Sequence, residues 1–510
     1  MITIVDFGSQ YTQLIARRVR GLGVYSRIVS CRDDVAEWFA NDPHGIILSG
    51  GPASLYEEDA PRLDDSFISR LSVPVLGVCY GHQALMMAMG GHVEQGGSGE
   101  YGRADVDLID ETDPLLHGVP HHHNVWMSHR DHVAALPEGF TRLASSKATP
   151  NCIVGNTERR VWGLQFHPEV HHTEHGGRYL ENFVFDICRS PRDWSLTDWV
   201  EQTCEEIRAQ AAGRPVLAAV SGGVDSTVMA VLLDKALGDQ ARIVFVDNGL
   251  LRAGEVEEVQ HILGTELGLN LKVASVAERF LSQLSGVTDP EEKRARIGRE
   301  FIEVFFGKEF GDEDLLAQGT LYPDVIESVS VRGPSDKIKT HHNRVPEVME
   351  LIEQGRVIEP LKELFKDEVR EVGRLLNIPR PVLERYPFPG PGLAIRILGE
   401  VTWERLALLR AADLIVREEI AKSPEQHAVW QMFAVLLPVR AVGVMGDRRT
   451  YANVACIRAV SSTDGMTADW SRLSYELLDV MSRRIVNEVV GINRVVYDIT
   501  SKPPGTIEWE

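Results

Sequence analysis

Residues 214–237 read RPVLAAVSGGVDSTVMAVLLDKAL, which is an apolar run, a polar glycine loop and an amphipathic helix in direct succession. This order is typical of the repeating unit of α/β proteins. Similar apolar runs end at glycine-rich or polar turns elsewhere: ITIV (2–5), GIILSG (45–50), PVLGV (74–78) and RIVFVD (242–247). They predict buried parallel strands, and ligands bind at the carboxyl ends of such strands.

The chain is long enough for several domains, since 510 residues exceed what one hydrophobic core usually organises. Two stretches interrupt the strand and helix pattern: the linker CRSPRDWSLTDW (188–199) and the glycine-proline segment RYPFPGPG (385–392). We therefore expect three domains, 1–189, 190–385 and 386–510. The first two are predicted to be doubly wound α/β domains with mainly parallel sheets, and the third a small α+β domain.

Composition and charge exclude several functional classes. The 53 Lys and Arg against 74 Asp and Glu give a net charge of -21, which disfavours binding to nucleic acid. The longest apolar stretch, residues 432–446, contains Pro438 and Arg440 and is shorter than the roughly 20 residues of a membrane span. Six cysteines without a CxxC pair, and a start without the order of a secretory signal, predict a cytoplasmic protein.

A cysteine stands where a strand is predicted to meet a helix. In PVLGVCYGHQALMMAMGG (74–91), Cys79 lies between Gly77 and Gly81. This G-x-C-x-G pattern is the thiol version of a nucleophile elbow, in which small neighbours allow a strained turn. The start of the helix favours the thiolate. A buried structural cysteine with glycines for close packing is the alternative that this motif alone leaves open.

A base for this thiol is found in GLQFHPEV (163–170), after another predicted strand. His167 can take the thiol proton and return it to a leaving group, while Glu169 orients the ring. A His-Pro turn capped by a carboxylate is the alternative. Backbone amides of Gly51, in a double glycine, and of Tyr80 are candidates for an oxyanion hole.

The elbow, the HPE motif and the double glycine together resemble the class I glutamine amidotransferases over residues 1–189. The resemblance implies that the cysteine attacks the side-chain amide of glutamine and that ammonia is released from a thioester. His82 stands where we expect methionine, and we assign it no catalytic role. The histidine-rich segments 121–129 and 167–175 lack the HExxH pattern, so we do not expect a transition-metal site there.

The glycine loop SGGVDS has the composition of a phosphate site. Consecutive amides at a helix start, with several hydroxyls nearby, can surround a phosphate group. No lysine follows as in a Walker A loop, so cleavage at the α-phosphate fits better than γ-phosphoryl transfer. A strand-helix turn with a serine N-cap explains single residues but not the whole cluster. The candidate residues are Ser221, Gly222, Gly223, Val224, Asp225, Ser226 and Thr227.

SGGVDS resembles the PP-loop of the N-type ATP pyrophosphatases. The resemblance implies ATP as co-substrate, with Mg²⁺ to neutralise the triphosphate and Asp225 to organise the loop or the metal. Asp247, at the end of the next predicted strand, is expected within reach of ATP.

Later segments indicate the substrate. Residues 291–305 concentrate positive charge, as an anionic substrate requires, although a solvated helix face is the alternative. The segments 316–328, 338–343 and 499–510 occur in the order found in the GMP synthase family, which the chain resembles over essentially its whole length. The resemblance implies glutamine, ATP and xanthosine monophosphate (XMP) as substrates, an adenylyl-XMP intermediate and a homodimer.

By the same resemblance, Arg294, Lys502 and Glu508 are expected to contact XMP, and Lys339 is the expected lid lysine that reaches the triphosphate. Residues 344–346, Arg-Val-Pro, stand where the family has glycines, which predicts altered lid motion. NAD synthetase, a sulfur-transferring tRNA enzyme and a catalytically inactive nucleotide-binding regulator are the competing interpretations. The glutamine amidotransferase domain argues against NAD synthetase, and the absence of basic faces argues against a tRNA enzyme. The intact motifs argue against an inactive regulator.

Overall fold

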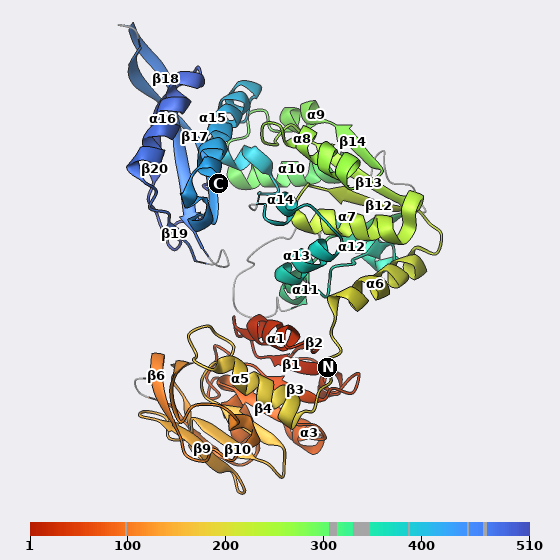
Figure 1. Cartoon of the computed structure of the whole chain (residues 1–510), viewed down its shortest axis with the longest axis vertical. Coiled ribbons are helices and arrows are strands. Elements are labelled where there is room, and N and C mark those ends of the chain that lie inside the picture. Colours follow the sequence, from red (N-terminus) through yellow and green to blue (C-terminus); the bar gives the residue numbers. More distant parts are fainter. Residues whose placement is uncertain (97–98, 305–313, 330–345, 386–387, 446–447, 463–466) are drawn as a thin grey trace. The chain divides into compact units, whose positions relative to one another are not determined.

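The computed structural model describes all residues except 97–98, 305–313, 330–345, 386–387, 446–447 and 463–466. The chain divides into two compact units, one built mainly from Met1–Trp199 and the other mainly from the residues that follow, to Glu510 (Figure 1). The division falls within helix α6 (Leu196–Ala211) and again at the start of α11 (Tyr322–Val329). In the part of the chain that the structure describes, none of the helices combines the length and hydropathy of a membrane span.

The first unit is organised around a mixed sheet with strand order β2-β1-β3-β4-β11-β10-β9-β6-β7. Its parallel half consists of β1 (Ile2–Asp6), β2 (Ser26–Ser30), β3 (Gly45–Leu48), β4 (Val75–Val78) and β11 (Val161–Leu164). Its antiparallel half consists of β10 (Ile153–Asn156), β9 (Thr141–Ser146), β6 (Glu100–Leu108) and β7 (His122–His129). The strands β5 (His92–Glu94) and β8 (His132–Ala135) pair separately. The helices are α1 (Thr12–Gly21), α2 (Val35–Trp38), α3 (Asp65–Ser69), α4 (Tyr80–Ala88) and α5 (Gly176–Glu181).

The predicted strands of this unit are confirmed. The runs at 2–5, 45–50 and 74–78 form β1, β3 and β4, which are parallel and buried along nearly their whole length. Continuous apolar runs are what a strand covered on both faces requires. The antiparallel half was not predicted, because a strand such as β6 alternates exposed and buried residues and contains no long apolar run. The α/β class holds for the unit as a whole.

The second unit contains a parallel sheet with strand order β14-β13-β12-β15-β16. These strands are β12 (Val216–Val220), β13 (Ala241–Asp247), β14 (Leu271–Ser275), β15 (Leu315–Ala317) and β16 (Val357–Ile358). The helices that accompany them are α7 (Val224–Leu237), α8 (Glu255–Val259), α9 (Ala277–Gln283), α10 (Pro290–Val304), α12 (Pro346–Glu353), α13 (Lys366–Leu375) and α14 (Arg380–Leu383). The predicted strand before the glycine loop and the one at 242–247 are therefore confirmed as β12 and β13, which are neighbours in the sheet.

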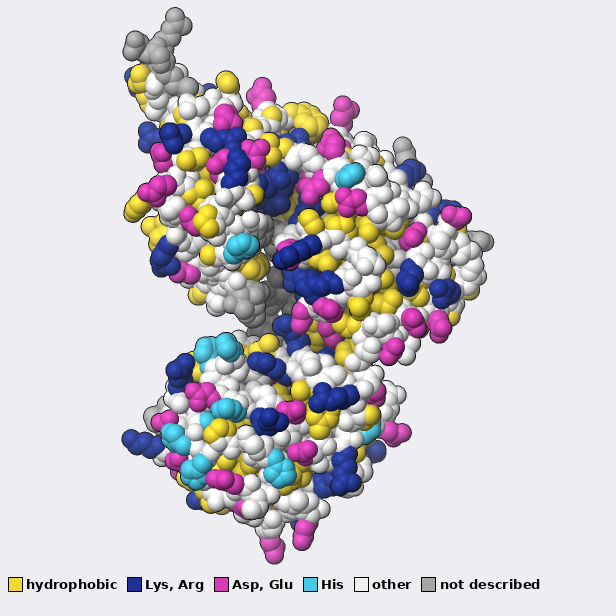
Figure 2. Space-filling view, viewed as in Figure 1, with side chains coloured by type: hydrophobic (Ala, Val, Ile, Leu, Met, Phe, Trp, Pro, Cys, Tyr) yellow, Lys and Arg dark blue, Asp and Glu magenta, His cyan; other side chains and the backbone are white. Residues whose placement is uncertain are grey.

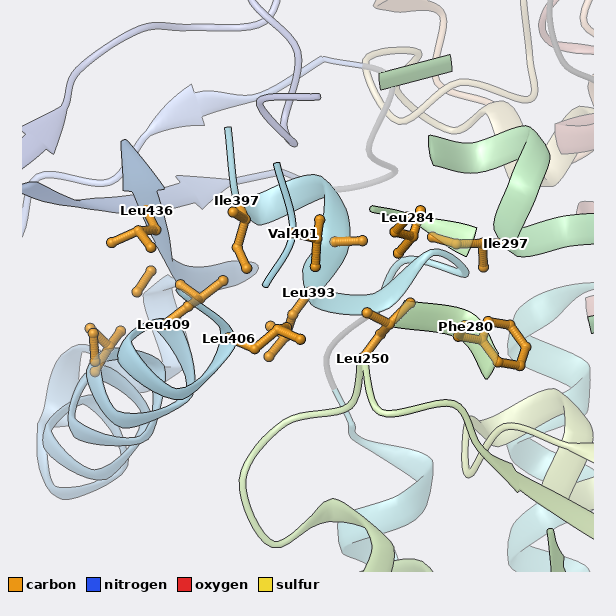
Figure 3. Close-up of a cluster of buried hydrophobic side chains, with 14 of the residues drawn as sticks. Leu250, Phe280, Leu284, Ile297, Leu393, Ile397, Val401, Leu406, Leu409 and Leu436 are labelled. Carbon is orange, nitrogen blue, oxygen red and sulfur yellow. The ribbon is translucent and has the colours of Figure 1, made fainter. Parts of the chain in front are cut away.

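The C-terminal part of the second unit is a smaller sheet with two helices. It contains β17 (Gln431–Met445), β18 (Arg448–Ser461), β19 (Asp469–Trp470) and β20 (Ile492–Asp498), with α15 (Trp403–Lys422) and α16 (Tyr475–Glu488). One hydrophobic core joins it to the parallel sheet. Figure 3 shows Leu250 and Phe280, from the loop and helix beside that sheet, in the same buried cluster as Leu406 and Leu436.

Candidate active sites

Cys79 lies at the turn between β4 and α4, with φ 50° and ψ -106°. A positive φ is strained for a residue with a side chain, and such strain is typical of a nucleophile elbow. The neighbouring glycines permit the turn. A Cβ at Gly77 would lie 2.6 Å from the His82 Cα, and one at Gly81 would lie 2.4 Å from the Leu48 carbonyl oxygen. The sequence therefore needs glycine on both sides of the thiol.

His167 and Glu169 follow β11 and form a buried pair, with His167 Nδ1 2.8 Å from Glu169 Oε1. Burial disfavours the charged ring, but the side chains of Cys79 and Glu169 outweigh it and raise the pKa of His167 well above its usual value. The structure thus brings together the three side chains that the motifs suggested, and their charges favour a protonated imidazole beside the thiol.

The two candidate oxyanion donors flank the same turn. Tyr80 is the first residue of α4 and follows Cys79 directly. Gly51 follows β3 and lies against Tyr80, since a Cβ at Gly51 would lie 3.3 Å from Tyr80 Cγ and 2.8 Å from the Phe7 carbonyl oxygen. Cys79 Sγ lies 3.6 Å from the Ser128 carbonyl oxygen at the end of β7.

His82 is fully buried on α4, and neither of its ring nitrogens makes a hydrogen bond of good geometry with the described residues. Burial lowers its pKa to about 3, so the ring is neutral at physiological pH. It packs where β11 has a glycine: a Cβ at Gly163 would lie 1.9 Å from His82 Nδ1. His82 therefore fills space between α4 and the sheet.

Other histidines gather on the surface of the first unit (Figure 2). Two of them pair with carboxylates: His121 lies 2.8 Å from Glu111, and His122 lies 2.8 Å from Asp107 and 3.6 Å from Asp105. Across the described ranges of the chain, no group of three or more His, Cys, Asp or Glu side chains has an arrangement that could hold a metal ion.

The glycine loop of the second unit joins β12 to α7 and folds back on itself through its own hydroxyls. Ser226 Oγ accepts the N–H of Ser221 at 3.2 Å and donates to the Gly223 carbonyl at 3.1 Å. Thr227 Oγ1 and Asp225 Oδ1 are buried and have no hydrogen-bond partner among the described residues. This concave turn stands at the N-terminus of a 14-residue helix, which is a favourable place for a phosphate group.

A lysine that the motifs did not single out contacts this loop. Lys366 is the first residue of α13, and its Nζ donates to Asp225 Oδ2. The two residues are 141 positions apart. No local sequence pattern around Lys366 predicts a contact with the loop. A positive charge thus reaches the loop from another helix.

Further polar groups collect at the carboxyl ends of the neighbouring strands. Asp247 ends β13, and its Oδ1 accepts the N–H of Gly249 at 3.1 Å. Gln318 and Glu359 follow β15 and β16, and each has a buried side-chain oxygen without a partner in the described part of the chain. A cavity of about 210 Å³ lies beside the end of β13, lined by Asp247 and Arg410 among others. The predicted ligand edge of the sheet is therefore polar.

The C-terminal tail lies against α10. Arg294 donates to the Glu510 carbonyl oxygen at 2.5 Å, and the fully buried Lys293 donates to the Glu510 carboxylate. Glu508 accepts two hydrogen bonds from the buried Arg396, at 2.7 and 2.9 Å. The predicted XMP residues Arg294 and Glu508 are therefore in one region, although both already have protein partners.

Two further residues complete the predicted set. The backbone of Lys502 pairs with that of Ala468 through hydrogen bonds of 2.7 and 3.0 Å. Lys339 and the changed lid positions 344–345 lie outside the described residues, and Pro346 begins α12.

Two protein-family models match parts of the chain. Residues 3–187 match the family model of the class-I glutamine amidotransferases, and residues 418–509 match that of the GMP synthase C terminal domain. The first unit, with a thiol elbow beside an imidazole and a carboxylate, thus defines a protein of the amidotransferase class.

The similarity extends over the whole chain. Proteins named "GMP synthase [glutamine-hydrolyzing]" from Aquifex aeolicus, Thermosynechococcus vestitus and Parasynechococcus marenigrum are 54%, 52% and 53% identical to it. Each comparison covers 100% of this chain and 99%, 96% and 98% of the relative, respectively. The chain therefore belongs to the GMP synthase (glutamine-hydrolysing) family.

Proposed function

We propose that this chain converts XMP to GMP, with glutamine as nitrogen donor and ATP as activating co-substrate. The observation that carries the proposal is the presence, on one polypeptide, of the Cys79–His167–Glu169 cluster and of the phosphate-type loop at the start of α7. The names of its full-length relatives support the same reaction.

The first unit hydrolyses glutamine. The Cys79 thiolate attacks the side-chain amide carbon, and the amides of Gly51 and Tyr80 stabilise the negative oxygen. His167 gives its proton to the departing nitrogen, so that ammonia leaves and a glutamyl thioester remains. The ring then takes a proton from water, which attacks the thioester and releases glutamate. Glu169 keeps the ring oriented and stabilises its charged form, as the raised pKa of His167 indicates.

The second unit activates the purine. O2 of XMP attacks the α-phosphorus of ATP, the bond to the β-phosphate oxygen breaks, and pyrophosphate leaves. Ammonia then attacks C2 of the adenylyl-XMP, and AMP departs with the former O2 to give GMP. The loop residues Ser221 to Thr227, among them Gly222, Gly223 and Val224, hold the pyrophosphate part of ATP. Lys366 and Lys339 add positive charge, and Asp247 lies at the adjoining strand end.

Magnesium fits this loop as a partner of ATP. Asp225 Oδ1 is a buried carboxylate oxygen without a hydrogen-bond partner in the described structure, and a carboxylate is the ligand that Mg²⁺ prefers. Mg²⁺ usually binds through one or two carboxylates and the phosphates of its substrate, so a dedicated cluster of protein ligands is not needed. When bound, the ion neutralises charge on the phosphates.

Arg294, Lys502 and Glu508 are proposed to contact XMP. Arg294 and Lys502 can pair with its phosphate, while Glu508 can accept hydrogen bonds from purine N–H groups. Glu508 Oε1 accepts from both Arg396 and Gln431, whereas Oε2 accepts from Arg396 and has a second lone pair to offer. Arg396 therefore orients Glu508 for the purine.

We further propose three functional domains, 1–189, 190–385 and 386–510, and a homodimer formed through the last of them. Exposed apolar side chains on β17 and β18, including Val444 and Tyr451, support such an interface. All six cysteines are free, which supports a reducing, cytoplasmic location.

The test of this function follows nitrogen from one unit to the other. Purified protein is given XMP, ATP, magnesium and glutamine labelled with nitrogen-15 in its side-chain amide. We expect the label in the 2-amino group of GMP, with AMP and pyrophosphate formed in equal amounts. Release of ADP and phosphate, or GMP without label, would contradict the proposal.

A further inference from the structure

Arg385 connects the glycine loop to helix α8 in the second unit. Its Nη1 donates to the Gly222 carbonyl oxygen at 2.9 Å, and its Nη2 donates to Glu255 Oε1 at 2.6 Å. Arg385 is 163 residues away from Gly222 in sequence, and its side chain is only 16% exposed. One guanidinium therefore fixes a loop carbonyl and a buried carboxylate at the same time.

The contact determines which way one peptide group faces. In a trans peptide the C=O and N–H point in opposite directions, so holding the Gly222 carbonyl toward Arg385 turns the Gly223 N–H to the other side. There the Gly223 N–H donates to Ser221 Oγ at 3.4 Å, within the loop. A peptide between two glycines has little steric preference of its own. If it rotated, a carbonyl oxygen would face the phosphate.

We propose that Arg385 is a positioning residue for ATP, which holds the Gly222–Gly223 peptide so that its N–H faces the phosphates. The inference rests on the proposed function, because it concerns the loop that binds ATP there. Arg385 does not touch the nucleotide in this scheme, and it acts through the loop alone.

Glu255 keeps the guanidinium in place. It is 2% exposed at the start of α8, and its second oxygen accepts the N–H of Arg252 at 2.8 Å. The loop before it is held from α15, where Arg410 donates to the Leu251 carbonyl at 2.9 Å and Arg417 to the Ala253 carbonyl at 3.2 Å. The anchor of Arg385 is therefore rigid. A lysine cannot replace it fully, since a single ammonium lacks the fork that reaches two acceptors.

The test compares Arg385→Gln and Arg385→Lys with a matched control, Arg380→Gln. Arg380 lies on the adjacent α14, is 84% exposed and pairs with Glu384. With ammonium as nitrogen donor, we expect Arg385→Gln to raise KM for ATP, and the Kd for inorganic pyrophosphate, by about tenfold or more. Arg385→Lys should recover part of this loss. Glutamine hydrolysis and the KM for ATP of Arg380→Gln should equal those of the wild type.

A purely structural role gives a different result. If Arg385→Gln lowers Tm or kcat while KM for ATP and pyrophosphate binding stay at wild-type values, the inference is overturned. Glu255→Gln should reproduce the rise in KM for ATP. The KM of the double variant should not exceed that of the single variant with the higher KM, because both residues act on the same peptide. Wild-type protein that makes no GMP from XMP would instead overturn the proposed function.

Discussion

Cys79 is held in a backbone conformation that costs of the order of 1–3 kcal/mol in other proteins, and its neighbours maintain it. Replacing Cys79 by alanine keeps the Cβ and removes only the sulfur. We expect Cys79→Ala to abolish glutamine-dependent GMP formation and to leave formation from added ammonium largely intact, as measured by release of AMP with each donor.

Cys31 is the matched control, because it is a partly exposed free thiol in the same unit. Cys31→Ala should retain both activities. Loss of both activities in Cys79→Ala would contradict separate sites for ammonia production and use.

Lys366 places a positive charge on the loop residue Asp225. Lys366→Met should reduce XMP-dependent exchange of label between pyrophosphate and ATP by at least about tenfold, because a charge-assisted contact to the phosphates is lost. Glutamine hydrolysis should continue. Arg374→Gln, a change at an exposed ion pair of the same helix, serves as control, and equal exchange rates in the two variants would remove Lys366 from the ATP site.

His82 makes the first unit sensitive to acid. Its folded pKa is about 3, below the unfolded value near 6.5, so the unfolded chain takes up a proton first as the pH falls. The wild type should therefore lose about 1.6 kcal/mol relative to His82→Met between pH 6.5 and pH 5. Urea unfolding of both proteins at the two pH values measures this, and parallel pH profiles would show that the ring finds a partner when charged.

At the scale of elements, the C-terminal tail is anchored by buried charges. Arg396 is fully buried, lies 3.9 Å from the ring centre of Phe433 and pairs with Glu508. Glu508→Gln would leave its guanidinium without a counter-charge, which typically costs about 3–5 kcal/mol.

We expect this variant to lower the Tm of the second unit and to raise KM for XMP. Asp469→Asn on β19 is the comparison, since it removes the charged partner of the exposed Arg472 and should change Tm little. An unchanged Tm in Glu508→Gln would mean that Arg396 is compensated by other groups.

Elements differ in how much their sequences reveal. β12 and β13 were predictable because strands covered on both faces need unbroken apolar runs. The apolar stretch 432–446 served only to exclude a membrane span, yet residues 432–445 lie in β17, with a register shift between Leu436 and Arg440. Pro438 lies inside that shift, where it is tolerated because the regular ladder is interrupted.

In the candidate sites, too, local motifs were predictable from the sequence and long-range contacts were not. The elbow, the HPE motif and SGGVDS are local, so the sequence could propose them as candidate sites. Lys366 and Arg385 reach the loop from 141 and 163 residues away, and no periodicity encodes such contacts. The partners of Glu508 and Arg294 are equally distant in sequence. The family resemblance therefore suggested contacts of both residues with XMP, but their contacts with Arg396 and with the C-terminal tail were not predicted.

For the whole molecule, the apolar surface of the C-terminal sheet predicts association. Val442 and Tyr451 face each other across β17 and β18 and are 43% and 58% exposed. Tyr451→Glu should convert a dimer into a monomer in light scattering coupled to gel filtration, because a buried charge at an interface is costly. Tyr101→Glu, at a similarly exposed tyrosine of the first unit, should leave the mass unchanged. A monomeric wild type would exclude this interface.

Unfolding of the continuous core that contains Leu250 and Leu436 would separate glutamine hydrolysis from GMP formation. Because this core joins the parallel sheet that carries the ATP loop to the C-terminal sheet, we expect the two sheets to unfold together as one block. The first unit is built on a separate hydrophobic cluster. Heat that unfolds only the second unit would leave a first unit that still hydrolyses glutamine and releases ammonia, while no GMP is formed. If that block unfolds before the first unit, its melting temperature is the temperature above which glutamine is consumed without GMP being formed.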